Sequence, residues 1–125
     1  MIFTVYGRKY KVDWYHARHE KPVPVRIVWF HGKRHSTVKE TFKIATTGCE
    51  MCRWDSRTKK WHHLVVADTM CMIGDNFSRR EGRKKSFTKA VMVVSHITAN
   101  KIKNPRLWRT RVWAQYKEQM PNDFK

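Results

Sequence analysis

The chain has 125 residues and a mass of 15.1 kDa, and 41% of its residues are hydrophobic. This is the size of one folded domain, and the apolar content excludes a disordered basic tail. No stretch reaches the roughly 18–20 apolar residues that a membrane-spanning helix needs. The N-terminal segment lacks the pattern of a signal peptide, and three cysteines are an odd number for a disulfide framework. We therefore expect a cytoplasmic protein with no membrane partner.

The net charge is +17, from 27 Lys and Arg against 10 Asp and Glu. Residues 1–48 carry ten basic and three acidic side chains, residues 49–78 four of each, and residues 79–125 thirteen and three. Such self-repulsion destabilises a free monomer, so a neutralising partner is the natural reason to tolerate it. The alternative is that the charge only keeps the protein soluble. The distribution predicts a polyanionic partner, contacted mainly after residue 78.

Alternating apolar and β-branched residues predict strands over the first two-thirds of the chain. Residues 16–24, with two prolines, are expected to form a loop, and Gly48 is expected to interrupt the chain before the last hairpin. The resulting antiparallel sheet has about five to six strands. They form three hairpins, with strands at residues 3–6 and 10–15, 25–30 and 35–46, and 49–54 and 61–73.

The third hairpin allows a prediction of register. Symmetric closure around the polar loop at residues 55–60 places Trp54 opposite Trp61 and Cys52 opposite His63. A cross-strand aromatic pair contributes about 0.5–1 kcal/mol and helps to fix the register. The other face of this hairpin is then expected to carry Cys49, Met51, Leu64 and Val66.

After Gly74 the apolar period changes to that of a helix, which predicts a helix over residues 83–99. Asn104 followed by Pro105 is a helix start signal. Apolar residues then recur every four positions until Pro121 ends the second helix; they are Trp108, Val112, Tyr116 and Met120. The expected fold is a single α+β domain over residues 1–125, an antiparallel sheet followed by two C-terminal helices.

Basic residues cluster around both predicted helices, and both helices begin within such a cluster. Several cations close together, with the N–H groups of a helix N-terminus, suit contact with a phosphate backbone. The alternative is a solvated helix face without a ligand. The candidate nucleic-acid-binding residues here are Arg79, Arg80, Arg83, Lys84, Lys85, Lys89, Lys101, Lys103, Arg106, Arg109 and Arg111.

The loop of the third hairpin is a second candidate. This loop holds four cations next to Trp54 and Trp61 in the sequence: Arg53, Arg57, Lys59 and Lys60. Cations beside exposed aromatic rings can hold single-stranded nucleic acid by stacking. The alternative is that the two tryptophans pair across the hairpin in a structural role.

Cysteines and histidines suggest a third candidate, a zinc site. Cys49 and Cys52 have the C-x2-C spacing of a zinc knuckle, and Cys71, His62 and His63 are possible further ligands. A second close ligand pair is missing, and on a regular strand the two cysteines point to opposite faces. Buried free cysteines are therefore the preferred interpretation, with no cofactor expected.

We find no motif for catalysis. The sequence contains no H-E-x-x-H, P-loop or G-x-S-x-G pattern, and its seven histidines are scattered. Asp55, Asp68 and Asp75 offer little material for a carboxylate cluster that would hold Mg²⁺ in a nuclease. We expect no enzymatic activity, no catalytic residues and no small-molecule substrate.

The segment from Asp75 to Lys84 reads D-x-F-x-R-x-x-G-R-K, with Cys71 on the strand before it and an amphipathic helix after it. It resembles a pattern in small uncharacterised proteins of bacteriophages and related mobile elements, over about a quarter of the chain. Residues 85–87 depart from the small apolar residues usual there. In structural terms, Asp75 is expected to cap the turn, Phe77 to fill the core, and Gly82 to adopt a backbone conformation that other residues avoid.

Charge and resemblance together lead to competing functional hypotheses. The first is a phage-type accessory protein that binds nucleic acid, DNA or RNA, through phosphate contacts in the bacterial host cytoplasm. The second is an anti-defence or host-takeover inhibitor, similar to anti-CRISPR proteins, that docks on a host nucleoprotein or nuclease. A small zinc-binding module is a third. Affinity for naked nucleic acid that falls steeply with salt distinguishes the first from the second.

Overall fold

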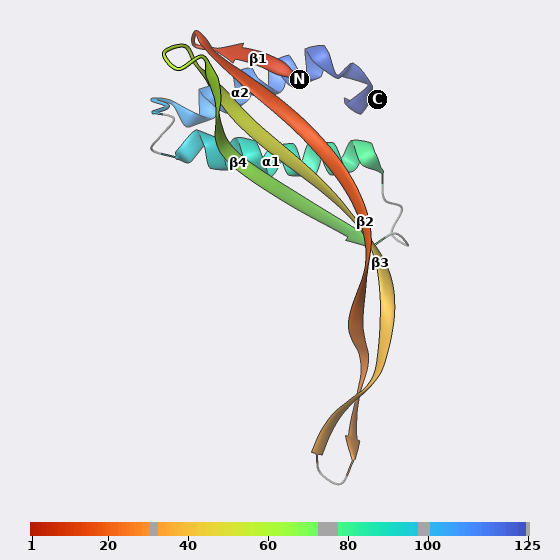
Figure 1. The fold of residues 1–125 in the computed structure, drawn as a ribbon. Helices are drawn as coiled ribbons and strands as arrows, with labels where there is room; N and C mark the ends of the chain where they lie inside the picture. Colours follow the sequence, from red (N-terminus) through yellow and green to blue (C-terminus); the bar gives the residue numbers. More distant parts are fainter. Residues whose placement is uncertain (31–32, 73–77, 98–100, 125) are drawn as a thin grey trace.

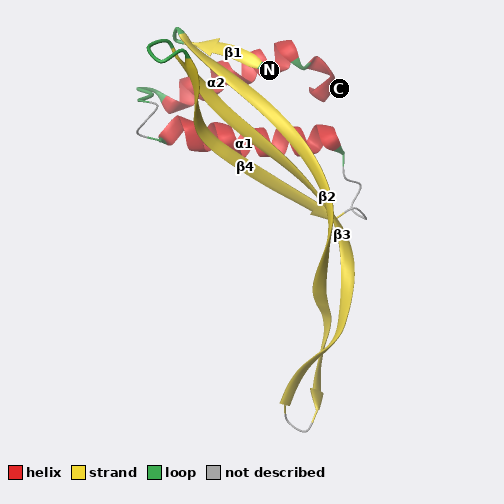
Figure 2. Cartoon of the chain, in the orientation of Figure 1, coloured by secondary structure: helices red, strands yellow, loops and turns green. Residues whose placement is uncertain are grey.

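The computed structural model describes residues 1–30, 33–72, 78–97 and 101–124; for residues 19–43, 71 and 72 it describes the backbone arrangement only. The fold is α+β, as predicted, with a four-stranded antiparallel sheet followed by two helices (Figure 2). The elements are β1 (Ile2–Val5), β2 (Arg8–Phe30), β3 (Lys33–Asp55), β4 (Lys60–Met72), α1 (Arg79–His96), α2 (Pro105–Gln119) and the short 3-10 helix η3 (Pro121–Phe124).

The strands form a meander in which each pairs with the next along the chain. The prediction of five to six strands is wrong, because residues 16–24 continue β2 and Gly48 lies inside β3. Pro22 and Pro24 both pair with residues of β3, while β1 covers β2 only along residues 8–11. A strand with a free edge accepts proline, since a nitrogen that faces that edge loses no ladder hydrogen bond.

Gly48 serves packing rather than chain reversal. It pairs with Tyr15 on β2, and a Cβ atom built on Gly48 would collide with the ring of Tyr15. The Tyr15 hydroxyl reaches across this glycine and donates a hydrogen bond of 2.8 Å to Oδ1 of Asp68 on β4. Gly48, which was expected to separate two strands, therefore allows the Tyr15 side chain to cross β3.

The hairpin of β2 and β3 extends far beyond the rest of the sheet. β4 pairs with β3 only from Ile44 onward, whereas β2 and β3 continue to pair with each other as far as Phe30 and Lys33. The outer part, residues 20–30 and 33–43, is a two-stranded ribbon that projects away from the helices (Figure 1). We call it the β2–β3 arm. Register shifts on either side of Arg26 mark a bulge within it.

The third hairpin has the predicted pairing. Trp54 pairs with Trp61, with ring centroids 5.2 Å apart, and Cys52 pairs with His63. Between Met51 and Cys52 the register shifts, so that Leu64 is an extra residue on β4. Such a bulge changes the alternation of the strand. The prediction for Val66 is therefore wrong, because Ala67 lies in the core and Val66 is 44% exposed.

The core lies between one face of the sheet and the two helices. Alternate residues of β1, β2 and β3 point to this face, while the helices contribute residues spaced three or four apart. Aromatic contacts link the layers: Phe87 of α1 stacks on Tyr116 of α2 at 4.7 Å, and Trp108 meets Tyr10 edge-on. The largest fully buried side chains are Trp108, Tyr10, Tyr116, Phe3, Phe87 and Met51.

Helix α1 begins at Arg79, four residues before the predicted start. The side chain of Ser78 caps it by accepting a hydrogen bond of 3.0 Å from the backbone N–H of Glu81. Gly82 therefore lies inside the helix, where it is buried, and the special backbone conformation expected of it is wrong. The expected roles of Asp75 and Phe77 fall outside the described residues.

Helix α2 matches its prediction closely. Asn104 is the N-cap and its Oδ1 accepts from the N–H of Leu107, Pro105 is the first residue, and the helix ends at Gln119 before Pro121. Trp108, Val112 and Tyr116 are buried as expected. Of the described helices, neither α1 nor α2 is long and apolar enough to cross a membrane.

Candidate functional site

The helical layer is strongly basic: some of its cations face solvent, while Lys89 donates a hydrogen bond to Asp68 on β4 and Arg111 lies over the ring of Tyr6. We define the basic helical surface by ten cations on α1, on α2 and on the segment before α2. Nine are exposed and Arg109 is half-buried. They are Arg79, Arg80, Lys85, Lys89, Lys101, Lys103, Arg106, Arg109, Arg111 and Lys117. The structure thus gathers on one layer most of the candidate cations from the C-terminal part of the chain, together with Lys117, which the sequence did not single out.

The acids of this part of the chain do little to balance the surface. Residues 79–125 contain three acids, Glu81, Glu118 and Asp123. Glu81 lies 2.9 Å from Nζ of Lys84, and Asp123 pairs with Arg83. Two of the three acids therefore bind cations outside the basic helical surface, which keeps a large excess of positive charge.

Arg83 and Lys84 were predicted to contact nucleic acid, but the structure gives Arg83 another role. Its guanidinium donates two hydrogen bonds to the carboxylate of Asp123, one of them from Nε at 3.1 Å. The Tyr116 hydroxyl donates to the same carboxylate. The hydrogen bonds from Arg83 hold the pKa of Asp123 below its ordinary value, whereas burial raises the pKa of Tyr116. This network ties α1 and α2 to η3, so Arg83 stabilises the fold.

A groove of about 510 Å³ runs between α1 and α2 on the basic helical surface. Val91, Met92 and Trp113 contribute apolar surface to its lining. Arg106, Arg109 and Lys117 also line it and supply positive charge. The Arg109 Nη1 donates to the Ser95 hydroxyl at 3.1 Å, which orients its guanidinium. The groove can accept a ligand that combines negative charge with an apolar part.

A second cavity of about 320 Å³ lies at the N-terminus of α2. Its lining includes Lys101, Lys103, Asn104 and Trp108. Helix N-termini attract anions because their first N–H groups lack helical partners and the helix dipole is positive there. Lys101 and Lys103 therefore lie beside a helix N-terminus, as the sequence analysis expected of basic residues at the start of this helix.

The loop of the third hairpin presents Arg57, Lys59 and Lys60 to solvent. Trp54 and Trp61 are half-buried and meet edge-on at 65°, and Nζ of Lys11 lies 5.0 Å from the centre of the Trp61 ring. These contacts support the structural role of the tryptophan pair. Lys11 adds positive charge beside the loop, which the sequence analysis did not include.

Two of the candidate zinc ligands, Cys49 and Cys52, lie on opposite faces of β3. Cys49 is fully buried in the core, where burial raises the pKa of its thiol to about 12. Cys52 is also buried, but it belongs to the opposite face of the strand. Both are free thiols, as preferred from the sequence. Cys71 lies on β4, and its side chain is outside the described part of the structure.

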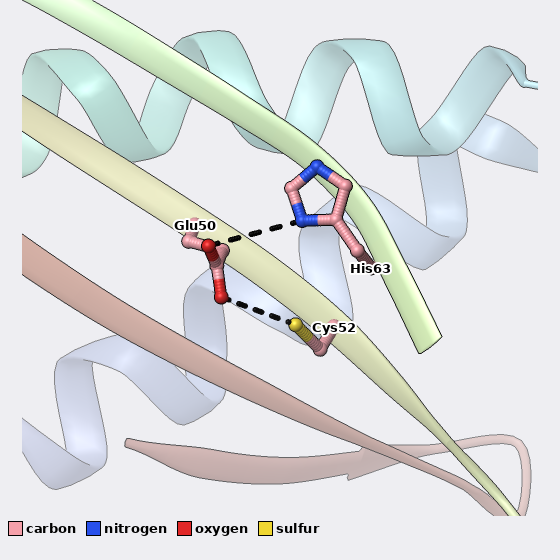
Figure 3. Close-up of side chains that lie close together, drawn as sticks. All are labelled: Glu50, Cys52 and His63. Atoms are coloured by element: carbon pink, nitrogen blue, oxygen red, sulfur yellow. Dashed lines mark hydrogen bonds and ion pairs between the residues drawn. The ribbon is translucent and has the colours of Figure 1, made fainter. Parts of the chain in front are cut away.

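On the face of the sheet away from the helices, Cys52 meets His63 and a residue that the sequence analysis did not select, Glu50 (Figure 3). The Cys52 thiol donates to Glu50 Oε1 at 3.5 Å, and His63 Nδ1 lies 3.8 Å from Glu50 Oε2. Among the described residues, this is the group of Cys, His and acidic side chains whose ligand atoms lie within 4.8 Å of one another, close enough to hold a metal ion. A signal for Glu50 was present: it stands two residues from Cys52, and same-face residues of a strand are two apart.

Searches against protein-family models, curated proteins and solved structures returned no match to the chain. The resemblance of residues 75–84 to phage proteins therefore stays a prediction.

Proposed function

We propose that the protein binds nucleic acid through phosphate contacts made by the basic helical surface, without enzymatic activity. The observation that carries the proposal is the charge balance of this layer. Ten cations lie on or between α1 and α2, while Glu81 and Asp123 are occupied by Lys84 and Arg83. A surface of nearly uniform positive charge on rigid helices attracts a polyanion. Binding of the polyanion then reduces the repulsion between the cations.

Two cavities lined by these cations support phosphate binding. The cavity at the start of α2 combines a helix N-terminus with Lys101 and Lys103, and the groove between the helices offers Arg106 and Lys117. Contacts of these kinds position a protein on a nucleic acid backbone and carry little sequence information. We therefore propose binding with weak dependence on sequence.

The β2–β3 arm supports the same function as a second contact. Its two strands carry six Lys and Arg against two Glu in the sequence. A two-stranded ribbon has the width that the major groove of DNA admits. An isolated two-stranded hairpin is marginally stable in water, so docking against a partner would also stabilise the arm. In this proposal, the helical layer binds the backbone while the arm extends along the nucleic acid.

A second candidate function is inhibition of a host nucleoprotein or nuclease by occupying its nucleic-acid channel. The observation that favours it is the apolar lining of the helical groove, where Met92 is 44% exposed and Trp113 is half-buried. A phosphate backbone makes little use of such surface, whereas a protein partner does. An inhibitor of this kind forms a discrete complex with one protein and binds naked nucleic acid feebly.

The test compares two variants that each remove three positive charges. One carries Lys101→Ala, Lys103→Ala and Arg106→Ala at the start of α2; the other carries Arg57→Ala, Lys59→Ala and Lys60→Ala in the hairpin loop. Affinity for labelled DNA and RNA is measured by anisotropy at fixed salt. We expect at least a tenfold larger loss for the first variant, because its charges lie at the proposed contact. Equal losses would show that net charge alone, and not this surface, governs binding.

A further inference from the structure

We propose that Glu50, Cys52 and His63 form a Zn²⁺ site on the face of the sheet away from the helices. The proposal is independent of nucleic-acid binding, because it rests on the donor set and on the backbone that holds it. The three ligand atoms lie within 4.8 Å of one another and come from two adjacent strands (Figure 3).

The backbone brings these side chains together. Glu50 and Cys52 are two residues apart on β3, so they share a face of the strand. His63 is the partner of Cys52 across the β3–β4 ladder. The bulge at Leu64 places His63, rather than Leu64, opposite Cys52, because it shifts the register immediately beside this pair. Bulges of this kind often aim a side chain toward a site.

The spacing of the donor atoms suits a tetrahedral ion. Zn²⁺ binds thiolate sulfur at about 2.3 Å and nitrogen or oxygen at about 2.0–2.2 Å, which places tetrahedral donors roughly 3.3–3.6 Å apart. Sγ of Cys52 lies 3.5 Å from Glu50 Oε1, and Nδ1 of His63 lies 3.8 Å from Glu50 Oε2. The two distances involve different oxygens of the Glu50 carboxylate, and all three ligand atoms lie within 4.8 Å of one another, so binding requires the side chains to rotate toward one ion.

The chemistry of the donors selects the metal. Thiolate and imidazole are soft and borderline ligands that favour Zn²⁺ over Mg²⁺ or Ca²⁺, which prefer oxygen. Cys52 is 5% exposed, whereas the side chains of Glu50 and His63 are 43% and 55% exposed. The buried sulfur is thus fixed within the sheet and the other two ligands face solvent, from which an ion can enter. Three protein ligands leave a fourth position for water.

An ion at this site would join β3 to β4 beside the Trp54–Trp61 pair. It would hold the third hairpin at the point where the bulge interrupts the regular ladder. The Cys49 thiol takes no part, since it lies in the core on the other face of β3. The C-x2-C spacing is therefore incidental, and the functional spacing is Glu50-x-Cys52 with a cross-strand histidine.

The full chain, freed of metal with a chelator and reduced, is titrated with Co²⁺ as a spectroscopic probe and then with Zn²⁺ in competition. We expect one ion per chain, a thiolate-to-cobalt charge-transfer band, and displacement by Zn²⁺. Cys52→Ala and His63→Gln should each weaken binding by more than about 100-fold, since loss of an outer-shell partner alone weakens metal binding 10–100-fold. Cys52→Ala should also abolish the charge-transfer band.

Matched controls are Cys49→Ala, which removes the neighbouring thiol, and His62→Gln, which removes the neighbouring imidazole. Both should bind the ion with unchanged stoichiometry. Circular dichroism checks that every variant is folded. If a cysteine variant fails to fold, Glu50→Gln tests the site in its place. The proposal is overturned if the wild-type chain binds no stoichiometric ion. Binding that survives Cys52→Ala, or that is lost equally in the two controls, would also overturn it.

Discussion

At the residue scale, the basic side chains differ in what they do, although the sequence presents them alike. Arg83 and Arg79 are both arginines at the start of α1, but Arg79 is exposed and Arg83 is bound to the buried carboxylate of Asp123. The partner lies 40 residues away in the chain. No local pattern could identify this pair, because it depends on how α2 and η3 pack against α1.

This difference predicts unequal effects on stability. Arg83→Ala leaves the buried Asp123 carboxylate without its cation and should lower the free energy of unfolding by about 3 kcal/mol. Breaking a buried ion pair usually costs about 3–5 kcal/mol. We take the low end of this range because the Arg83 side chain is 24% exposed and solvent weakens the pair. Arg79→Ala should change stability by less than about 0.5 kcal/mol. Urea unfolding of both variants measures the difference, and equal effects would contradict the role assigned to Arg83.

The same carboxylate predicts a dependence on acid. The pKa of Asp123 in the folded state is lowered from its ordinary value of 3.8, chiefly by the hydrogen bonds from Arg83. Its contribution to stability is therefore complete above that value and is lost as the pH falls through the lower folded-state pKa. Asp123→Asn should be less stable than the wild type at about pH 6. This difference in stability should be smaller at about pH 3. Thermal unfolding at the two pH values checks this, and a constant difference would refute it.

At the element scale, hairpins and helices with local signals were predictable. The polar loop between two tryptophans indicated the third hairpin and its register, and Asn104 with Pro105 indicated the start of α2. The number of strands was not predictable, since Pro22 and Pro24 normally mark a loop. The part of β2 that carries them has an edge that β1 does not cover, where proline is tolerated, and strand pairing is a property of the whole sheet.

Gly48 provides a test of this sheet geometry. Gly48→Ala should destabilise the protein by about 0.5–1.5 kcal/mol, because the added methyl group displaces the half-exposed Tyr15 ring and breaks its hydrogen bond to Asp68. The double variant with Tyr15→Ala should recover part of the loss, although it also removes the hydrogen bond to Asp68. Denaturant unfolding of the single and double variants measures the coupling. Additive losses would mean that the ring does not restrict this position.

The β2–β3 arm provides a second test at this scale. The core residues lie on β1, on the inner parts of β2, β3 and β4, and on the helices. Replacing residues 22–41 with a two-residue Asn-Gly turn should therefore leave a folded domain, because this turn favours hairpin closure. We expect a cooperative unfolding transition and weaker nucleic-acid binding. Loss of cooperative unfolding would show that the arm is part of the folding unit.

At the scale of the whole molecule, the structure shows where part of the +17 charge lies. The part of it carried by α1, α2 and their connection lies on one layer, and the arm projects away from that layer (Figure 1). The sequence indicated where along the chain the charge was concentrated. It could not show that Arg83 is paired with Asp123, that Lys117 belongs to the basic helical surface, or that two cavities lie among these cations.

The salt dependence of binding tests the central claim most directly. Each phosphate neutralised on duplex DNA contributes about −0.9 to the slope of log K against log salt concentration. If about half of the ten surface cations contact phosphates, the wild-type protein should show a slope of about −4 to −5. A slope near zero, or no binding to DNA or RNA at low salt, would contradict phosphate recognition.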